Sequence, residues 1–170
     1  MRSILFTALI LSRSIGICQP SQDSVILSAA REIMESTFTC VFITVDKKMP
    51  RARTMDPFKP EEDFTVWLAT NPNSRKVKEI KKNARVTLYY QDGENGYVSL
   101  YGKATLINDS AEKERRWKTG WSAFYPNRNE AFLLIKVVPV KLEVISYKRG
   151  INGDAKTWQP ASFVFSKSGN

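Results

Sequence analysis

Hydrophobic residues recur at helical spacing in one early segment and alternate with polar residues through much of the rest of the chain. Between Asp23 and Ser36, apolar side chains recur every three or four positions, which predicts an amphipathic helix capped by Asp23. From Phe38 to Val45 the period changes to two, and β-branched and aromatic residues dominate, as in a half-buried strand. The pattern therefore predicts one helix followed by a region rich in strands.

Turn residues divide this region into short strands. A helix capped by Ser74 and another that begins with the capping pair Asp109 and Glu112 and carries Trp117 are expected between them. Successive strands joined by short turns favour an antiparallel sheet, and six or so strands around one core favour closure into a small barrel with helices packed outside. The segments with strand character are 50–55, 64–70, 85–90, 97–107, 131–147 (one strand or two, broken near Pro139) and 162–165.

The first residues follow a different pattern. A basic start at Arg2 precedes an apolar run at 4–11, and small residues follow near Gly16 and Cys18. These features are typical of a secretory signal peptide, so we expect residues 1–18 to be removed and the mature chain to be exported to the periplasm or outside the cell. The alternatives are an upstream extension of a cytoplasmic protein and a buried N-terminal helix. The apolar run is too short to span a bilayer, so no stable membrane insertion is expected after cleavage.

Length, charge and composition limit the classes of function that this chain can have. The chain has 170 residues, room for one core, so residues 19–170 are expected to form a single domain. The net charge of +9 suits an anionic ligand, but no nucleic-acid-binding motif is recognisable. Histidine is absent, which excludes Ser-His-Asp and Cys-His catalysis and His-ligated metal. Chemistry would therefore come from a bound cofactor, and we expect no metal site and name no catalytic residue.

Two further features have ordinary structural interpretations. Cys40 alternates with Phe38 and Phe42 along a strand, which favours a buried, inert thiol over a nucleophile. A group of aromatic residues gathers near a predicted helix end and is expected to form core or dimer contacts rather than a substrate cage. Its members are Trp117, Trp121, Phe124 and Tyr125.

The stretch from Thr70 to Lys76 places a strand end, a tight turn and a helix start in succession. A helix N-terminus offers backbone N–H groups without helical partners and the positive end of the helix dipole. Ser74 adds a hydroxyl group, and Arg75 and Lys76 add two cations in the first turn. Such a set of donors suits a phosphate monoester. The other interpretation is a capped surface helix whose basic residues are simply solvated.

The stretch from Thr70 to Lys76, together with two other stretches, resembles the pyridoxamine 5′-phosphate oxidase superfamily, and more closely its general stress protein branch. The likeness runs from about Val25 to Tyr147 and includes the hydrophobic positions that follow the helix start. Three motifs carry it: Thr70-Asn71-x-x-Ser74-Arg75-Lys76, Pro50-Arg51-Ala52-Arg53-Thr54-Met55, and Tyr97-Val98-Ser99-Leu100-Tyr101-Gly102-Lys103-Ala104 with its Gly-x-Ala ending.

The resemblance implies a mainly β, α+β fold, a split β-barrel of six to seven antiparallel strands with flanking helices. It also implies a homodimer that binds FMN in a groove at the subunit interface. Arg53 would pair with the flavin phosphate or ribityl chain, and the backbone of Thr54 and Met55 would lie against the ribityl chain and the isoalloxazine. Tyr97 would face the flavin from the partner subunit. The implied phosphate pocket consists of Thr70, Ser74, Arg75 and Lys76.

The implied function is that of an FMN-dependent oxidoreductase with an unknown small-molecule substrate. The true oxidase holds its vitamin substrate with an arginine and a histidine near its C-terminus, and this chain has no histidine, so pyridoxamine phosphate oxidation is not expected. The alternatives are a non-catalytic flavin-binding or stress-related carrier and a deazaflavin-dependent reductase. Trp158 either covers the ligand groove or packs on the barrel.

Overall fold

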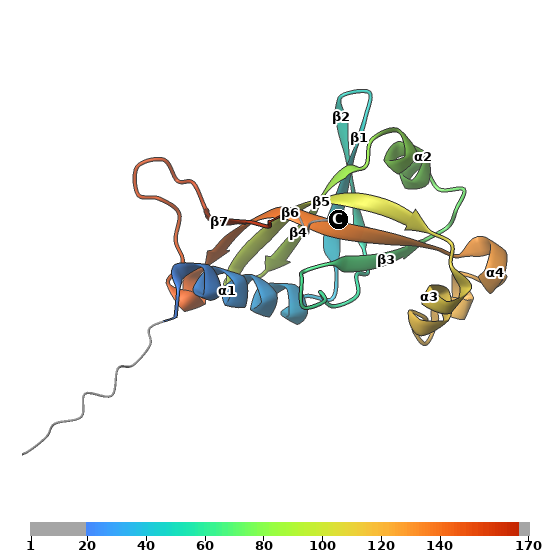
Figure 1. Cartoon of the computed structure of the whole chain (residues 1–170), viewed down its shortest axis with the longest axis horizontal. Helices are drawn as coiled ribbons and strands as arrows, with labels where there is room; N and C mark the ends of the chain where they lie inside the picture. The colour runs from blue at the N-terminus through green and yellow to red at the C-terminus, as the bar shows by residue number, and fades with distance from the viewer. Residues whose placement is uncertain (1–19, 167–170) are drawn as a thin grey trace, which may run out of the picture.

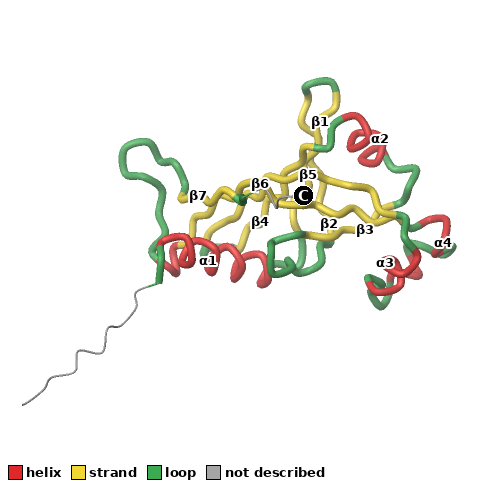
Figure 2. The backbone as a smooth tube through the Cα atoms, in the orientation of Figure 1, coloured by secondary structure: helices red, strands yellow, loops and turns green. Residues whose placement is uncertain are grey.

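The computed structural model describes residues 20–166, so the expected signal peptide at 1–18 lies outside the described residues. Within these residues, seven strands form one antiparallel sheet in the order β2-β1-β4-β5-β6-β3, and β7 also pairs with β6. The helices lie around this sheet (Figures 1 and 2). The strands are β1 (Cys40–Asp46), β2 (Met49–Met55), β3 (Val66–Thr70), β4 (Arg85–Asp92), β5 (Gly96–Ile107), β6 (Leu133–Ser146) and β7 (Ala161–Val164). The helices are α1 (Gln22–Ser36), α2 (Arg75–Lys82), α3 (Ser110–Arg115) and α4 (Arg128–Ala131), with short 3₁₀ turns at Trp121–Ala123 and Tyr147–Arg149.

The sheet curls into a barrel that is not fully closed. Its two ends are the edge strands β2 and β3. Directly after β2, Pro57 forms an isolated bridge with Leu68 of β3, and the N–H of Phe58 donates to the carbonyl of Trp67 at 2.9 Å. The two ends of the sheet therefore approach each other without a continuous ladder, which is the expected split β-barrel with flanking helices.

Strand β6 is continuous, and the predicted break near Pro139 is wrong. The register against β5 shifts between Tyr101 and Gly102, which pair with Lys141 and Pro139, so that Val140 is the extra residue of a β-bulge. Proline has no N–H to give to a ladder, and a bulge is one of the few places in a sheet where it fits. The strand therefore bends at this point without ending.

Helix α1 lies over one face of the sheet (Figure 1), and its buried side chains are Ile26, Ala29, Ala30, Ile33 and Met34. It begins two residues earlier than predicted: Ser21 is the N-cap and its hydroxyl accepts from the N–H of Ser24 at 3.2 Å, whereas Asp23 lies in the first turn. An acid in the first turn still interacts favourably with the helix dipole. In residues 20–166, no helix is both long and apolar enough to span a membrane.

A second, smaller core lies where α3, α4 and the end of β3 meet. Trp67, which alternation along β3 places opposite Leu68, packs there, and the guanidinium of Arg116 lies 3.8 Å from its ring. Trp117 lies just past the end of α3 rather than within it, because the helix ends at Arg115. Most of the predicted aromatic group thus forms core, but Phe124 is 77% exposed. The members of this core are Trp67, Ala69, Trp121, Phe132 and Leu134, with Phe58, Ile107, Trp117 and Tyr125 against them.

Candidate phosphate-binding site

A short turn places the start of α2 directly beside the end of β3. The side-chain oxygen of Asn71 accepts from the N–H of Asn73 at 2.8 Å, and the carbonyl of Asn71 accepts from the N–H of Ser74 at 3.0 Å. Asparagine commonly closes turns in this way. The turn makes Ser74 the N-cap of α2, as the sequence predicts.

The Ser74 hydroxyl makes no capping hydrogen bond to the helix. Its Oγ lies 3.0 Å from the Oγ1 of Thr70, and the Nζ of Lys76 donates to the same Thr70 oxygen at 3.1 Å. Two hydroxyl groups and one ammonium group therefore converge beside the first turn of α2. The helix itself leaves its first backbone N–H groups without helical partners, so the cluster and the helix start present donors to the same region.

Arg53 reaches this region from β2, but it is already bonded to two other side chains. Its NH1 donates to Oγ1 of Thr44 at 2.6 Å, and its NH2 donates to Oε2 of Glu79 at 2.7 Å. The Thr44 hydroxyl donates to the same oxygen of Glu79 at 2.5 Å. The three side chains form a closed triangle that joins β1, β2 and α2, which stand side by side in Figure 1.

The charges in this cluster shift one another's protonation. Burial lowers the pKa of Lys76, and the positive charge of Arg53 lowers it further, whereas the charge of Glu79 acts in the opposite direction. For Glu79, burial acts to raise the pKa, but the hydrogen bonds from Thr44 and Arg53 outweigh it and the pKa falls below its ordinary value. At neutral pH the site therefore holds a carboxylate between cations, and the net charge of the group remains positive.

The structure brings together most, but not all, of the residues predicted for the cofactor. Arg75 is exposed and, among residues 20–166, makes no hydrogen bond or ion pair. Thr54 and Met55 point to opposite faces of β2, since Thr54 is exposed and Met55 packs against the main core. Both could contact one ligand only through their backbone, as the resemblance implies. Tyr97 pairs with Gln91, at the end of β4 that is remote from α2.

Tyr97 lies instead beside a separate hollow. Together with Tyr147 and Trp158 it borders a cavity of about 410 Å³. Trp158 is 85% exposed, so within one chain it does not pack on the barrel, and its backbone has a φ of 60°. Trp158 thus borders this hollow without packing on the barrel, and whether it covers a ligand groove stays a prediction.

Sequence reasoning missed Thr44 and Glu79. Both residues stand out in the sequence. Thr44 is a polar residue among the apolar residues on the buried face of β1, and Glu79 is the one acidic residue between Ser74 and Arg85. Neither signal identifies a partner, because Thr44 and Glu79 are 35 positions apart in the sequence. Only the packing of α2 against β1 places them together.

Comparison with known proteins assigns the family. The model of the family described as "Pyridoxamine 5'-phosphate oxidase like" matches residues 27–148, nearly the span of the sequence resemblance. General stress protein 26 of Bacillus subtilis is 27% identical over 96 residues, which are 54% of this chain and 67% of that protein.

Solved structures share the fold. The General Stress Protein 26 of Bacillus anthracis has 22% identity and a TM-score of 0.66, with 81% of this chain and 97% of that one covered. A Clostridium acetobutylicum protein related to general stress protein 26 has 21% identity and a TM-score of 0.68, with 85% and 96% covered. The family match spans most of the main core, the β3–α2 turn and the hydroxyl–lysine cluster, and the chain belongs to the pyridoxamine 5′-phosphate oxidase like family.

Proposed function

We propose that this chain is an FMN-binding flavoprotein and that it acts as an oxidoreductase on a small-molecule substrate. The observation that carries the proposal is the cluster of Thr70, Ser74 and Lys76 at the start of α2, with 3.0 and 3.1 Å between its polar atoms. A phosphate monoester needs several donors and a positive charge in one place. The cluster, the helix start and the remaining N–H groups of Arg53 supply them.

FMN fits these residues better than a ligand without phosphate. The hydroxyls of Thr70 and Ser74 and the ammonium of Lys76 would hold the phosphate, and the exposed Arg75 would add charge at the rim. The backbone of Thr54 and Met55 would border the ribityl chain. Bound FMN would supply hydride or electron transfer at its ring, and the protein would supply anchoring and shielding from water.

A second copy of the chain is part of the proposal. Tyr97 lies six residues along β5 from Lys103, the partner of Arg85 at the start of β4, so Tyr97 is about 20 Å from the strand end that follows α2. We propose that Tyr97 and its neighbour Trp158 face the flavin held by the partner subunit in a homodimer. Such an arrangement gives the 410 Å³ hollow beside Tyr97 a role at the interface.

The test compares FMN with riboflavin, which has the same ring but no phosphate. We expect the purified chain to bind FMN at least tenfold more tightly than riboflavin, and Lys76→Ala to weaken FMN binding about tenfold or more, since a hydrogen bond to a charged group contributes roughly 1.5–3 kcal/mol. Riboflavin binding should be indifferent to this substitution. Equal affinity of the wild type for both flavins would contradict the proposal.

Turnover is tested separately from binding. An oxidoreductase should show bleaching of the flavin absorption by NADH or NADPH, followed by recovery when an electron acceptor is added. A protein that keeps its flavin oxidised under both nucleotides would be the non-catalytic carrier instead. The absorption and mass spectra of the bound cofactor distinguish FMN from a deazaflavin.

A further inference from the structure

Glu79 is a buried acid within a site that needs positive charge. It is the one acidic residue between Ser74 and Arg85, yet only 6% of its surface is exposed, whereas its neighbours Lys78 and Lys81 face solvent. Placing an unpaired carboxylate in such a position would be costly. The proposed binding of a phosphate does not by itself explain why an acid lies here.

The contacts of Glu79 explain how the acid is accommodated. Its Oε2 accepts from the Thr44 hydroxyl at 2.5 Å and from NH2 of Arg53 at 2.7 Å, and NH1 of Arg53 donates to Thr44 at 2.6 Å. The guanidinium group has five N–H donors in a rigid plane. The two bonds engage one donor on each terminal nitrogen and leave three, so Arg53 can be held in place and still donate to a ligand.

We propose that Glu79 is a positioning residue, which works with Thr44 to hold the guanidinium of Arg53 in place for the phosphate bound by Ser74 and Lys76. The proposal rests on the proposed FMN function. A free arginine side chain has many rotamers, and ordering it on binding reduces affinity. The triangle of Thr44, Arg53 and Glu79 orders it beforehand. The charge of the carboxylate also partly offsets the repulsion between Arg53 and Lys76.

A simpler electrostatic role predicts the opposite result. If Glu79 acted only through its charge, it would repel the phosphate, and removing it would tighten FMN binding. If it acted only by filling space under α2, its removal would weaken the binding of FMN and riboflavin by similar factors. Positioning of Arg53 predicts a loss that is confined to the ligand with a phosphate.

The experiment measures the dissociation constants of FMN and riboflavin for the full chain and its variants by flavin fluorescence. We expect Glu79→Ala to weaken FMN binding about tenfold and to leave riboflavin unchanged. Glu79→Gln should restore part of the loss, because its amide oxygen can still accept from Arg53 and Thr44. Lys78→Ala, on the exposed face of the same helix, is the matched control and should behave as the wild type. Tighter FMN binding, or equal losses for both flavins, would overturn the proposal.

A double-mutant cycle checks that Glu79 acts through Arg53. On an Arg53→Ala background, Glu79→Ala should cause no further loss of FMN affinity, whereas an additional tenfold loss would contradict the proposal. Thr44→Val retains Glu79 and the shape of the core and should give a smaller, phosphate-specific loss, so it decides the matter if Glu79→Ala does not fold. If the wild type does not prefer FMN to riboflavin, both the proposed function and the role of Glu79 are contradicted. If the wild type prefers FMN and Glu79→Ala retains the full preference, only the role of Glu79 is contradicted.

Discussion

Lys76 differs from the other lysines of α2 in its burial and its neighbours. Lys78, Lys81 and Lys82 on the same helix are exposed, whereas Lys76 is half-buried, donates to Thr70, and carries a lowered pKa because of burial and the nearby charge of Arg53. A lowered pKa means that this ammonium loses its proton at a lower pH than an ordinary lysine.

This difference predicts how FMN binding depends on pH. As the pH rises through the lowered pKa of Lys76, below the ordinary lysine value of 10.5, the ammonium becomes neutral and the affinity for FMN should fall. The measurement is the ratio of FMN to riboflavin affinity, which cancels any change at the flavin ring. In Lys76→Arg the ratio should stay level across the same range, because arginine remains protonated. A ratio that does not change with pH in the wild type would contradict the assignment.

Burial shifts the pKa of Cys40 in the opposite direction to that of Lys76. The residue is 2% exposed within the main core, and burial raises the pKa of its thiol to about 12. The thiolate is the reactive form, so Cys40 should resist iodoacetamide at pH 8 in the folded protein and react fully in denaturant. Peptide mapping by mass spectrometry reports this residue separately from Cys18. Rapid labelling of Cys40 in the native protein would show that the strand opens.

The residues of the site divide into those that the sequence could supply and those that it could not. Ser74 and Lys76 lie within one turn of a local motif, and local spacing is what a sequence displays. Thr44 and Glu79 meet through the packing of α2 on β1, which no local pattern encodes. The hydroxyl of Ser74 pairs with Thr70 of the preceding strand and not with the helix, a partner that local spacing does not indicate.

At the scale of elements, the bulge in β6 shows how a sequence signal for a break can mark a bend instead. Pro139 does mark an irregularity in β6, but β5 continues alongside and pairs with β6 on both sides of this residue. The partner of Pro139 is Gly102, the glycine of the Gly-x-Ala motif. A β-carbon at Gly102 would lie 2.7 Å from the carbonyl oxygen of Val138 and 2.7 Å from a methyl group of Val137. The motif therefore needs glycine for close approach between strands.

The bulge makes Gly102→Ala a sharp test of this packing. The added methyl group must displace the backbone of β6, and overpacking of this kind costs about 1–3 kcal/mol. The midpoint of urea unfolding should therefore fall relative to the wild type. Lys103→Ala, the exposed neighbour on β5, is the control and should change the midpoint little. A variant as stable as the wild type would mean that the two strands can separate locally at no cost.

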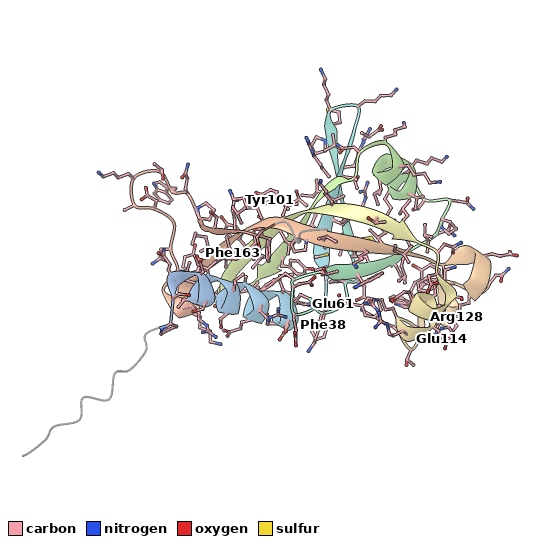
Figure 3. The ribbon with its side chains drawn as sticks, viewed as in Figure 1. Phe38, Glu61, Tyr101, Glu114, Arg128 and Phe163 are labelled. Atoms are coloured by element: carbon pink, nitrogen blue, oxygen red, sulfur yellow. The ribbon has the colours of Figure 1, made fainter. Side chains whose placement is uncertain are left out.

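At the scale of the whole molecule, the split barrel could be predicted because strand count, short turns and the family motifs all indicated it. The second core of Trp67 and its neighbours could be expected only as an aromatic cluster, since its members come from segments far apart in the sequence. In the described part of the single chain, the face of the sheet away from α1 is left uncovered. Tyr101 lies on this face (Figure 3), and it is 37% exposed, while Val138 and Val140 of the neighbouring β6 are 44% and 45% exposed. A cavity of about 410 Å³ lies beside them, lined in part by Ile43 and Val45.

This apolar face leads to the prediction of the homodimer. Burial of apolar surface contributes about 25 cal/mol per Å², and contiguous exposed apolar surface commonly marks an interface. We expect the full chain to be a dimer by light scattering at micromolar concentration. Val140→Lys places a charge in the middle of this face and should give a folded monomer with weakened FMN binding, because Tyr97 of one copy would no longer meet the flavin of the other. Phe38→Ser removes another exposed hydrophobic residue, 91% exposed and on the side of α1 (Figure 3), and should leave the dimer intact. A wild-type monomer that binds FMN with full affinity, or a Val140→Lys dimer as stable as the wild type, would show that this face is not the interface.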